Sequence, residues 1–160
     1  MIVIVLAAAC GNPDPDNGGA DAATAVDADE GPPFSFFITS LETMQLQAGN
    51  SLGFGGNLGG LAGADAICQR AATDVGYGDK TWRAFLSVTS GPGGGAVHAI
   101  DRIGAGPWYD RNGRLIASDK AGLAMTRPAG DAQASSDLGD EKGRSLHFFV
   151  HAHDIITGAI

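Results

Sequence analysis

The sequence lacks the motifs that mark most enzyme classes. It contains no P-loop and no dinucleotide-binding fingerprint. Its only two cysteines are Cys10 and Cys68. Cys68 falls on the apolar side of a predicted helix, where burial disfavours a reactive thiolate. We therefore expect a protein that is not an enzyme and that uses no cofactor.

Basic residues are missing from the amino-terminal end, which is otherwise typical of an exported lipoprotein. Residues 1–9, MIVIVLAAA, form an apolar run that ends in small residues before Cys10. This pattern predicts a signal peptide and lipobox at residues 1–10, with cleavage before Cys10 and a lipid on that cysteine. The run is too short for a membrane-spanning helix. The alternative is that residues 2–6 are a buried first strand and that Cys10 is an ordinary thiol.

Residues 11–33 contain six acidic residues, no basic residue and no aromatic residue, with many Pro, Gly, Asp and Ala. Such a segment cannot bury enough apolar surface to offset the entropy lost on ordering, so we predict a disordered acidic tether. The chain has eighteen acidic and ten basic residues. Without the tether it is nearly neutral, so the net charge of −8 gives no indication of nucleic-acid binding.

The 25 glycines and the 7% aromatic content favour one loop-rich α+β domain over residues 34–160. Its clearest element is a predicted helix at residues 61–74, followed by a strand at residues 81–87 with Trp82 and Ala84 on one face. The apolar residues of the helix recur every three or four positions and form one stripe. They are Leu61, Ala64, Cys68, Ala71 and Val75.

Weaker patterns predict the flanking elements. Residues 34–40 read as the first strand of the domain, and residues 41–58 as a polar, Gly-rich connection in which Phe54 packs. Residues 96–103 are expected to form a short helix. Residues 118–125 are expected to form a helical turn capped by Ser118.

Asn112-Gly113 is a strong hairpin-turn signal between Trp108-Tyr109 and a returning strand at residues 115–117. The two aromatic rings suit sugar stacking, but the simpler interpretation places at least one of them in the core.

Three stretches together resemble a known family: GLAGADAICQRAA, TWRAFLS and DRIGAGPWYDRNGRLIA. They are similar to the endostatin domain of collagens and its bacterial relatives, in the C-type-lectin-like superfamily. The resemblance covers about residues 34–117 and implies a C-type-lectin-like fold that is incomplete at its carboxyl end. In those relatives a later cysteine forms the core disulfide, so the resemblance implies that Cys68 is an unpaired buried thiol here.

Ligand motifs of that superfamily are absent. The Glu-Pro-Asn, Gln-Pro-Asp and Trp-Asn-Asp sequences of calcium-dependent lectins do not occur. His147, His151 and His153 with Asp154 have a spacing that could hold structural zinc, although we assign no metal site. Arginines could form an anion-binding patch, but scattered arginines partly paired with aspartates fit the spacing better. The arginines considered are Arg70, Arg83, Arg102, Arg111, Arg114 and Arg127.

These observations predict a bacterial cell-envelope protein held by its lipid in the outer membrane or at the cell surface. Its domain is expected to bind a glycan or an extracellular protein without catalysis. The alternatives are a zinc-stabilised structural module of the envelope and a truncated, non-functional fragment of a longer lipoprotein.

Overall fold

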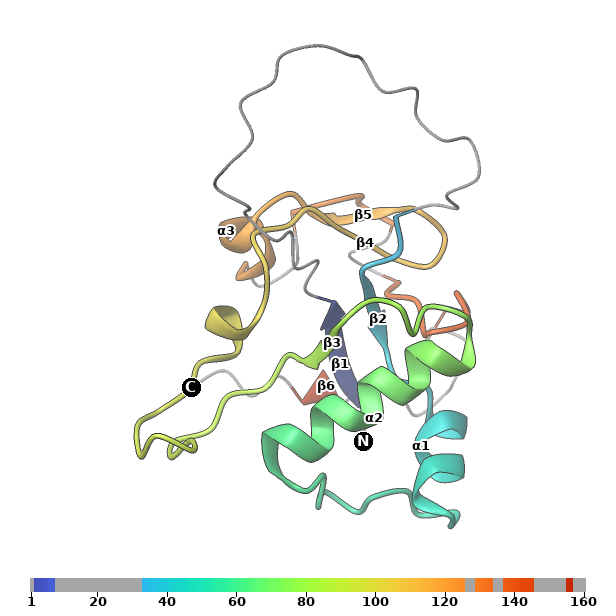
Figure 1. Ribbon diagram of the computed structural model, residues 1–160. Helices are drawn as coiled ribbons and strands as arrows, with labels where there is room; N and C mark the ends of the chain where they lie inside the picture. The colour runs from blue at the N-terminus through green and yellow to red at the C-terminus, as the bar shows by residue number, and fades with distance from the viewer. Residues whose placement is uncertain (1, 8–32, 126–128, 134–136, 146–154, 157–160) are drawn as a thin grey trace, which may run out of the picture.

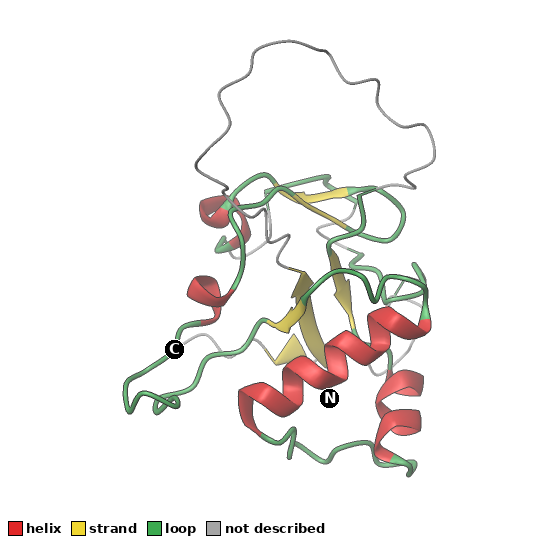
Figure 2. Cartoon of the chain, in the orientation of Figure 1, coloured by secondary structure: helices red, strands yellow, loops and turns green. Residues whose placement is uncertain are grey.

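The computed structural model describes residues 2–7, 33–125, 129–133, 137–145 and 155–156 (Figure 1). Helices and strands are mixed within one unit, with a four-stranded sheet and a separate two-stranded sheet (Figure 2). This confirms the α+β class predicted from the composition.

Strand β1 (Ile2–Ala7) is the hub of the four-stranded sheet. It pairs antiparallel with β2 (Phe36–Ile38) on one side and with β3 (Trp82–Ala84) on the other. Its first residues also pair in parallel with β6 (Ile155–Ile156). Residues 2–7 are therefore a strand, as in the alternative reading of this segment. Cys10 and the predicted cleavage site lie outside the described residues, so the lipid anchor stays a prediction.

Helix α2 (Gly60–Asp74) crosses in front of the strands (Figure 1) and begins one residue before the predicted start. Its buried face packs with β3 and the aromatic residues of β2 in the first core. This face is wider than the predicted stripe, because Ile67 and Ala72 are also buried whereas Leu61 and Val75 are only half-buried. A helix that lies against a sheet contacts it over more than one row of side chains.

The predicted strands at residues 34–40 and 81–87 are confirmed but shorter. Ring contacts join the start of β2 to β3, since the ring centroids of Phe34 and Phe37 each lie 4.9 Å from that of Trp82. Alternation along β2 turns Phe37 into the first core and Phe36 and Ile38 into a second core on the other face. The sheet therefore lies between two apolar cores.

The second core is closed by the predicted hairpin, β4 (Trp108–Tyr109) paired with β5 (Leu115–Ala117), and by α3 (Lys120–Leu123). Trp108 is 1% exposed and belongs to this core, so a sugar-stacking role for its ring is wrong. The predicted cap of α3 is also wrong: the side chain of Asp119, and not that of Ser118, accepts a hydrogen bond from the Gly122 N–H.

A helix stands where the sequence predicted a polar connection. Helix α1 (Leu41–Ala48) begins after Ser40, whose hydroxyl accepts a hydrogen bond from the Thr43 N–H. Only Thr43 and Met44 of α1 are buried, so the segment has too little apolar periodicity to be read as a helix. The expectation that Phe54 packs is confirmed, because it lies half-buried against the first core.

The short helix predicted at residues 96–103 is only a 3-10 turn at Ala99–Arg102. Val97 instead pairs with Val88, each N–H donating to the other residue's carbonyl at 2.9 Å. Because this pairing keeps Val97 extended, the helical turn begins only at Ala99.

Candidate functional site

A shallow, open groove lies beside the amino-terminal end of α2 and is a candidate binding surface. Its volume is about 710 Å³, and apolar side chains form most of its walls. The groove is lined by residues of α2, β3 and the segment at residues 92–104: Leu61, Ala62, Asp65, Arg83, Pro92, Val97, Asp101, Arg102, Ile103 and Gly104.

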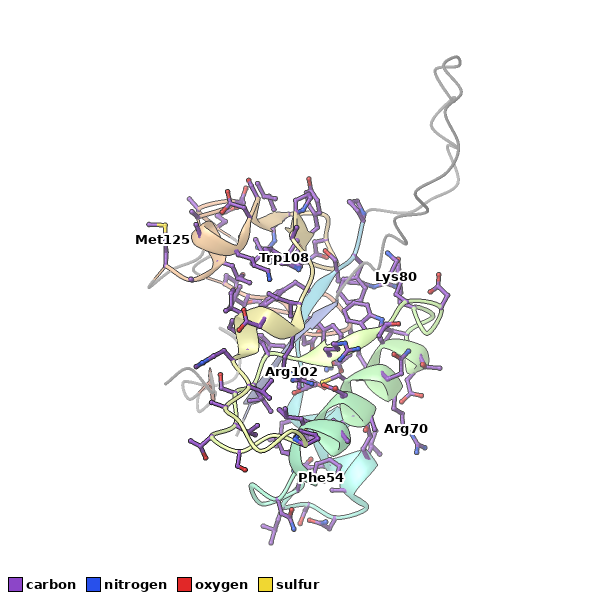
Figure 3. All side chains as sticks on the ribbon, turned by 60° about the vertical axis from the view of Figure 1, so that its left-hand side comes forward. Phe54, Arg70, Lys80, Arg102, Trp108 and Met125 are labelled. Atoms are coloured by element: carbon purple, nitrogen blue, oxygen red, sulfur yellow. The ribbon has the colours of Figure 1, made fainter. Side chains whose placement is uncertain are left out.

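Asp65 and Arg102 form an ion pair in this groove. Arg102 Nη2 lies 2.7 Å from Asp65 Oδ1 and 2.6 Å from Oδ2, and the arginine side chain is 7% exposed. The pair also binds the backbone of β3, because Asp65 Oδ1 accepts from the Ala84 N–H while Arg102 Nη1 donates to the Ala84 carbonyl. Figure 3 shows Arg102 between α2 and β3. Both side chains therefore use their charged groups to hold α2, β3 and the 3-10 turn together, and few of their hydrogen-bonding positions remain for a ligand.

Two other charged side chains at the groove are exposed. Arg83 projects from β3 and Asp101 from the 3-10 turn, and both line the groove. Arg83 can donate hydrogen bonds and Asp101 can accept them, next to an apolar wall. This combination suits a polar, uncharged ligand. The sequence placed Arg83 on the face of β3 opposite Trp82, and its exposure confirms this.

Cys68 lies away from this groove, in the first core, and is fully buried. Burial, and secondly the negative charge of Asp65, raise the pKa of the Cys68 thiol well above its ordinary value. The thiol is unpaired, as the resemblance implied. A neutral, buried thiol cannot act as a nucleophile.

Three of the arginines considered for an anion patch are held at separate places, and Arg127 lies outside the described residues. Arg102 pairs with Asp65, and Arg114 Nε lies 2.6 Å from Asp110 Oδ2. Arg111 stacks on aromatic rings, with its guanidinium carbon 4.4 Å from the Tyr77 ring centroid. These contacts favour the interpretation of scattered, partly paired arginines.

Two buried aspartates that the sequence analysis missed hold matching turns, each of the pattern D-x-x-G-R. In the first turn, Asp110 Oδ1 accepts from the N–H groups of Asn112 and Arg114, and Oδ2 accepts from the Arg114 side chain. In the second, Asp140 makes the same three bonds to Lys142 and Arg144. The repeated pattern in residues 110–114 and 140–144 was the available sequence signal.

Glu141 is a third buried acid, and no sequence pattern pointed to it. Its carboxylate accepts from the Ser40 N–H and from the hydroxyls of Ser40 and Thr43, at distances of 2.6–2.8 Å. It therefore binds the start of α1, where the helix dipole favours a negative charge. Both oxygens of this buried carboxylate accept hydrogen bonds from the start of α1, which indicates a structural role.

The other predicted site residues cannot be placed. Cys10, His147, His151, His153 and Asp154 lie outside the described residues. Within the parts that are described, no three His, Cys, Asp or Glu residues come close enough together to hold a metal ion. The zinc alternative thus stays a prediction, which metal analysis of the purified protein would test. None of the described helices is long and apolar enough to span a membrane.

Comparison with known proteins gives no further assignment: no family model, no curated protein and no solved structure matches this chain.

Proposed function

We propose that this chain is a lipid-anchored protein of the bacterial cell envelope whose C-type-lectin-like domain binds a glycan or protein ligand without catalysis. The observation that carries this proposal is the three-part order of the sequence: an apolar run ending at Cys10, an acidic tether, and a domain with its own cores. Tethers of this composition keep a domain clear of the membrane surface. The family resemblance supports the fold type, since its three motifs fall on α2, β3 and the hairpin.

The groove beside α2 is the proposed ligand surface. It combines an apolar wall with the exposed side chains of Arg83 and Asp101. Its buried charges are already paired, so a ligand need not neutralise them. A sugar or a polar peptide segment meets these conditions better than a multiply charged ligand.

The anchor is tested by radiolabelled palmitate in a bacterial host that expresses the full chain. We expect label in the wild type and in Cys68→Ala, and none in Cys10→Ala, which should also leave the membrane fraction. Equal membrane association of Cys10→Ala and the wild type would rule out the anchor.

Ligand binding is tested on an array of bacterial surface glycans with the full chain in detergent. Arg83→Ala should weaken any binding by about tenfold, equal to about 1.4 kcal/mol. Arg70→Ala is the matched control, because Arg70 is an exposed arginine on α2 that does not line the groove (Figure 3). Equal loss in both variants would exclude the groove as the ligand surface.

A further inference from the structure

Every strand pairing in the four-stranded sheet includes β1. The described strands β2, β3 and β6 pair with β1 and not with one another. Val5 lies between Phe37 and Ala84 in the register, so the three-residue strands β2 and β3 flank the same part of the six-residue strand β1. Without residues 2–7, these three strands would have no sheet.

The outer edges of β2 and β3 are already closed. On β2, the Ile38 N–H donates to the Gly139 carbonyl at 3.0 Å. On β3, Ala84 is bound on both its N–H and its carbonyl by the Asp65–Arg102 pair. Since successive residues of a strand present their backbone groups to opposite sides, Phe37 and Arg83 turn theirs toward β1. The edges that face β1 are the ones that need a partner strand.

The central position of β1 in the sheet also determines which kinds of residue can form a strand there. Because one apolar core lies on each face of the sheet, a strand at this position must be apolar at successive residues. The sequence IVIVLA meets that requirement. A signal peptide requires the same kind of run, so one segment satisfies both a central strand and an export signal.

We propose that the space between β2 and β3 is a strand-binding site. Residues 2–7 occupy it as a separable donor strand, which is held by sheet pairing and does not depend on the tether. The inference goes beyond ligand binding and bears on the anchor. Residues 2–7 cannot pair in this sheet and serve as an inserted signal peptide at the same time. Cleavage before Cys10 would remove the donor strand and leave the site to another apolar strand.

A cut in the tether of the folded full chain tests this proposal. A recognition sequence for a site-specific protease is inserted after residue 22, so that the released peptide keeps three acidic residues for solubility. After cutting, we expect the amino-terminal peptide to co-elute with the domain in size exclusion and to separate in denaturant. A peptide that elutes alone, beside a domain with an unchanged thermal melt, would overturn the proposal.

Two further measurements separate strand binding from general misfolding. An isotope-labelled peptide of residues 1–22 should replace the bound peptide in the cut wild-type protein, as mass spectrometry of the complex would show. A labelled peptide with Val5→Pro should fail to do so, because proline removes a backbone donor in a central strand. Ala9→Pro, two residues beyond β1, is the matched control and should exchange normally. Equal exchange of all three peptides would refute pairing through residues 2–7.

The uncut protein tests whether a second copy supplies the strand. A dimer in the uncut protein that persists on dilution would show that residues 2–7 occupy the site of a second copy, which contradicts the intrachain assignment. The palmitate experiment is independent of these results. A retained peptide with no palmitate label would support the strand and refute the anchor, whereas a free peptide with label would do the reverse.

Discussion

Asp110 and Asp140 hold turns with the same hydrogen-bond pattern at the two ends of β2. In each turn the aspartate binds two backbone N–H groups and the arginine four residues later. The residue before each aspartate accepts a backbone hydrogen bond at one end of β2: Tyr109 from Ser35, just before the strand, and Gly139 from Ile38, its last residue. Asn112 joins the turns by donating to the Gly143 carbonyl at 3.0 Å. The two turns thus fix the two ends of β2.

Replacing either aspartate should destabilise the domain. Asp140 is fully buried. Asp140→Ala leaves two backbone N–H groups without their acceptor and removes one of the two carboxylates that Arg144 binds, so we expect a loss of about 3 kcal/mol. Asp140→Asn keeps an acceptor oxygen and should lose less. Chemical denaturation measures the difference, with the exposed Asp79 changed to alanine as control at less than about 0.5 kcal/mol. Equal stability of Asp140→Ala and wild type would show that the turn forms without its carboxylate.

Glu141 and Ser40 give a second test, at the start of α1. Glu141→Ala removes the acceptor of three hydrogen bonds and leaves buried hydroxyls unpaired, which should cost about 2–4 kcal/mol. Glu141→Gln keeps one acceptor oxygen and should cost less. Loss of α1 helicity by amide hydrogen exchange, with α2 still protected, is the specific result. Uniform loss of protection in both helices would contradict a local role.

The sequence correctly predicted the elements that are stabilised by residues close to one another in the chain. The stripe from Ala64 to Ala71 and the Asn112-Gly113 turn carry their periodicity or turn chemistry within a few residues, so α2 and the hairpin were found. Helix α1 was missed because it depends on Glu141, about a hundred residues away. Such long-range contacts leave no periodic signal.

The apolar start of the chain could not be resolved for a different reason. A strand buried on both faces and the apolar part of a signal peptide require the same unbroken run. Only pairing partners distinguish them, and Val5 finds these in Phe37 and Ala84. The sequence likewise could not predict that Arg83 and Asp101 line one groove, because separate segments bring them there by packing.

Glu42 should contribute a pH-dependent and salt-dependent stability. Its carboxylate lies 3.0 Å from Lys142 Nζ and 3.2 Å from Arg144 Nη1. The hydrogen bond from Lys142 is the main cause that lowers the pKa of Glu42 below its ordinary value of 4.5. A lowered folded-state pKa stabilises the domain above pH 4.5, and this stabilisation is lost as the pH falls through the folded-state value.

The measurement is the melting temperature of wild type and Glu42→Gln between pH 3 and 7. We expect wild type to be the more stable at pH 7, with the difference shrinking toward pH 3 and in high salt, because both partners are exposed. A difference that is the same at both ends of the pH range would exclude an electrostatic origin.

Cys68 provides the last test, of the first core. Because burial raises its pKa well above 9.0, the folded state favours the neutral thiol. The resulting stabilisation is present below the unfolded-state pKa and is lost as the pH rises toward the folded-state value.

In Cys10→Ala, which leaves Cys68 as the only thiol, a thiol reagent at pH 8 should label the native protein slowly and the denatured protein at once. Cys68→Ala should cost about 1–2 kcal/mol through the small cavity it leaves, and it should remove the alkaline loss of stability. Rapid native labelling would mean that α2 does not bury this thiol against β3 and would contradict the packing of the first core.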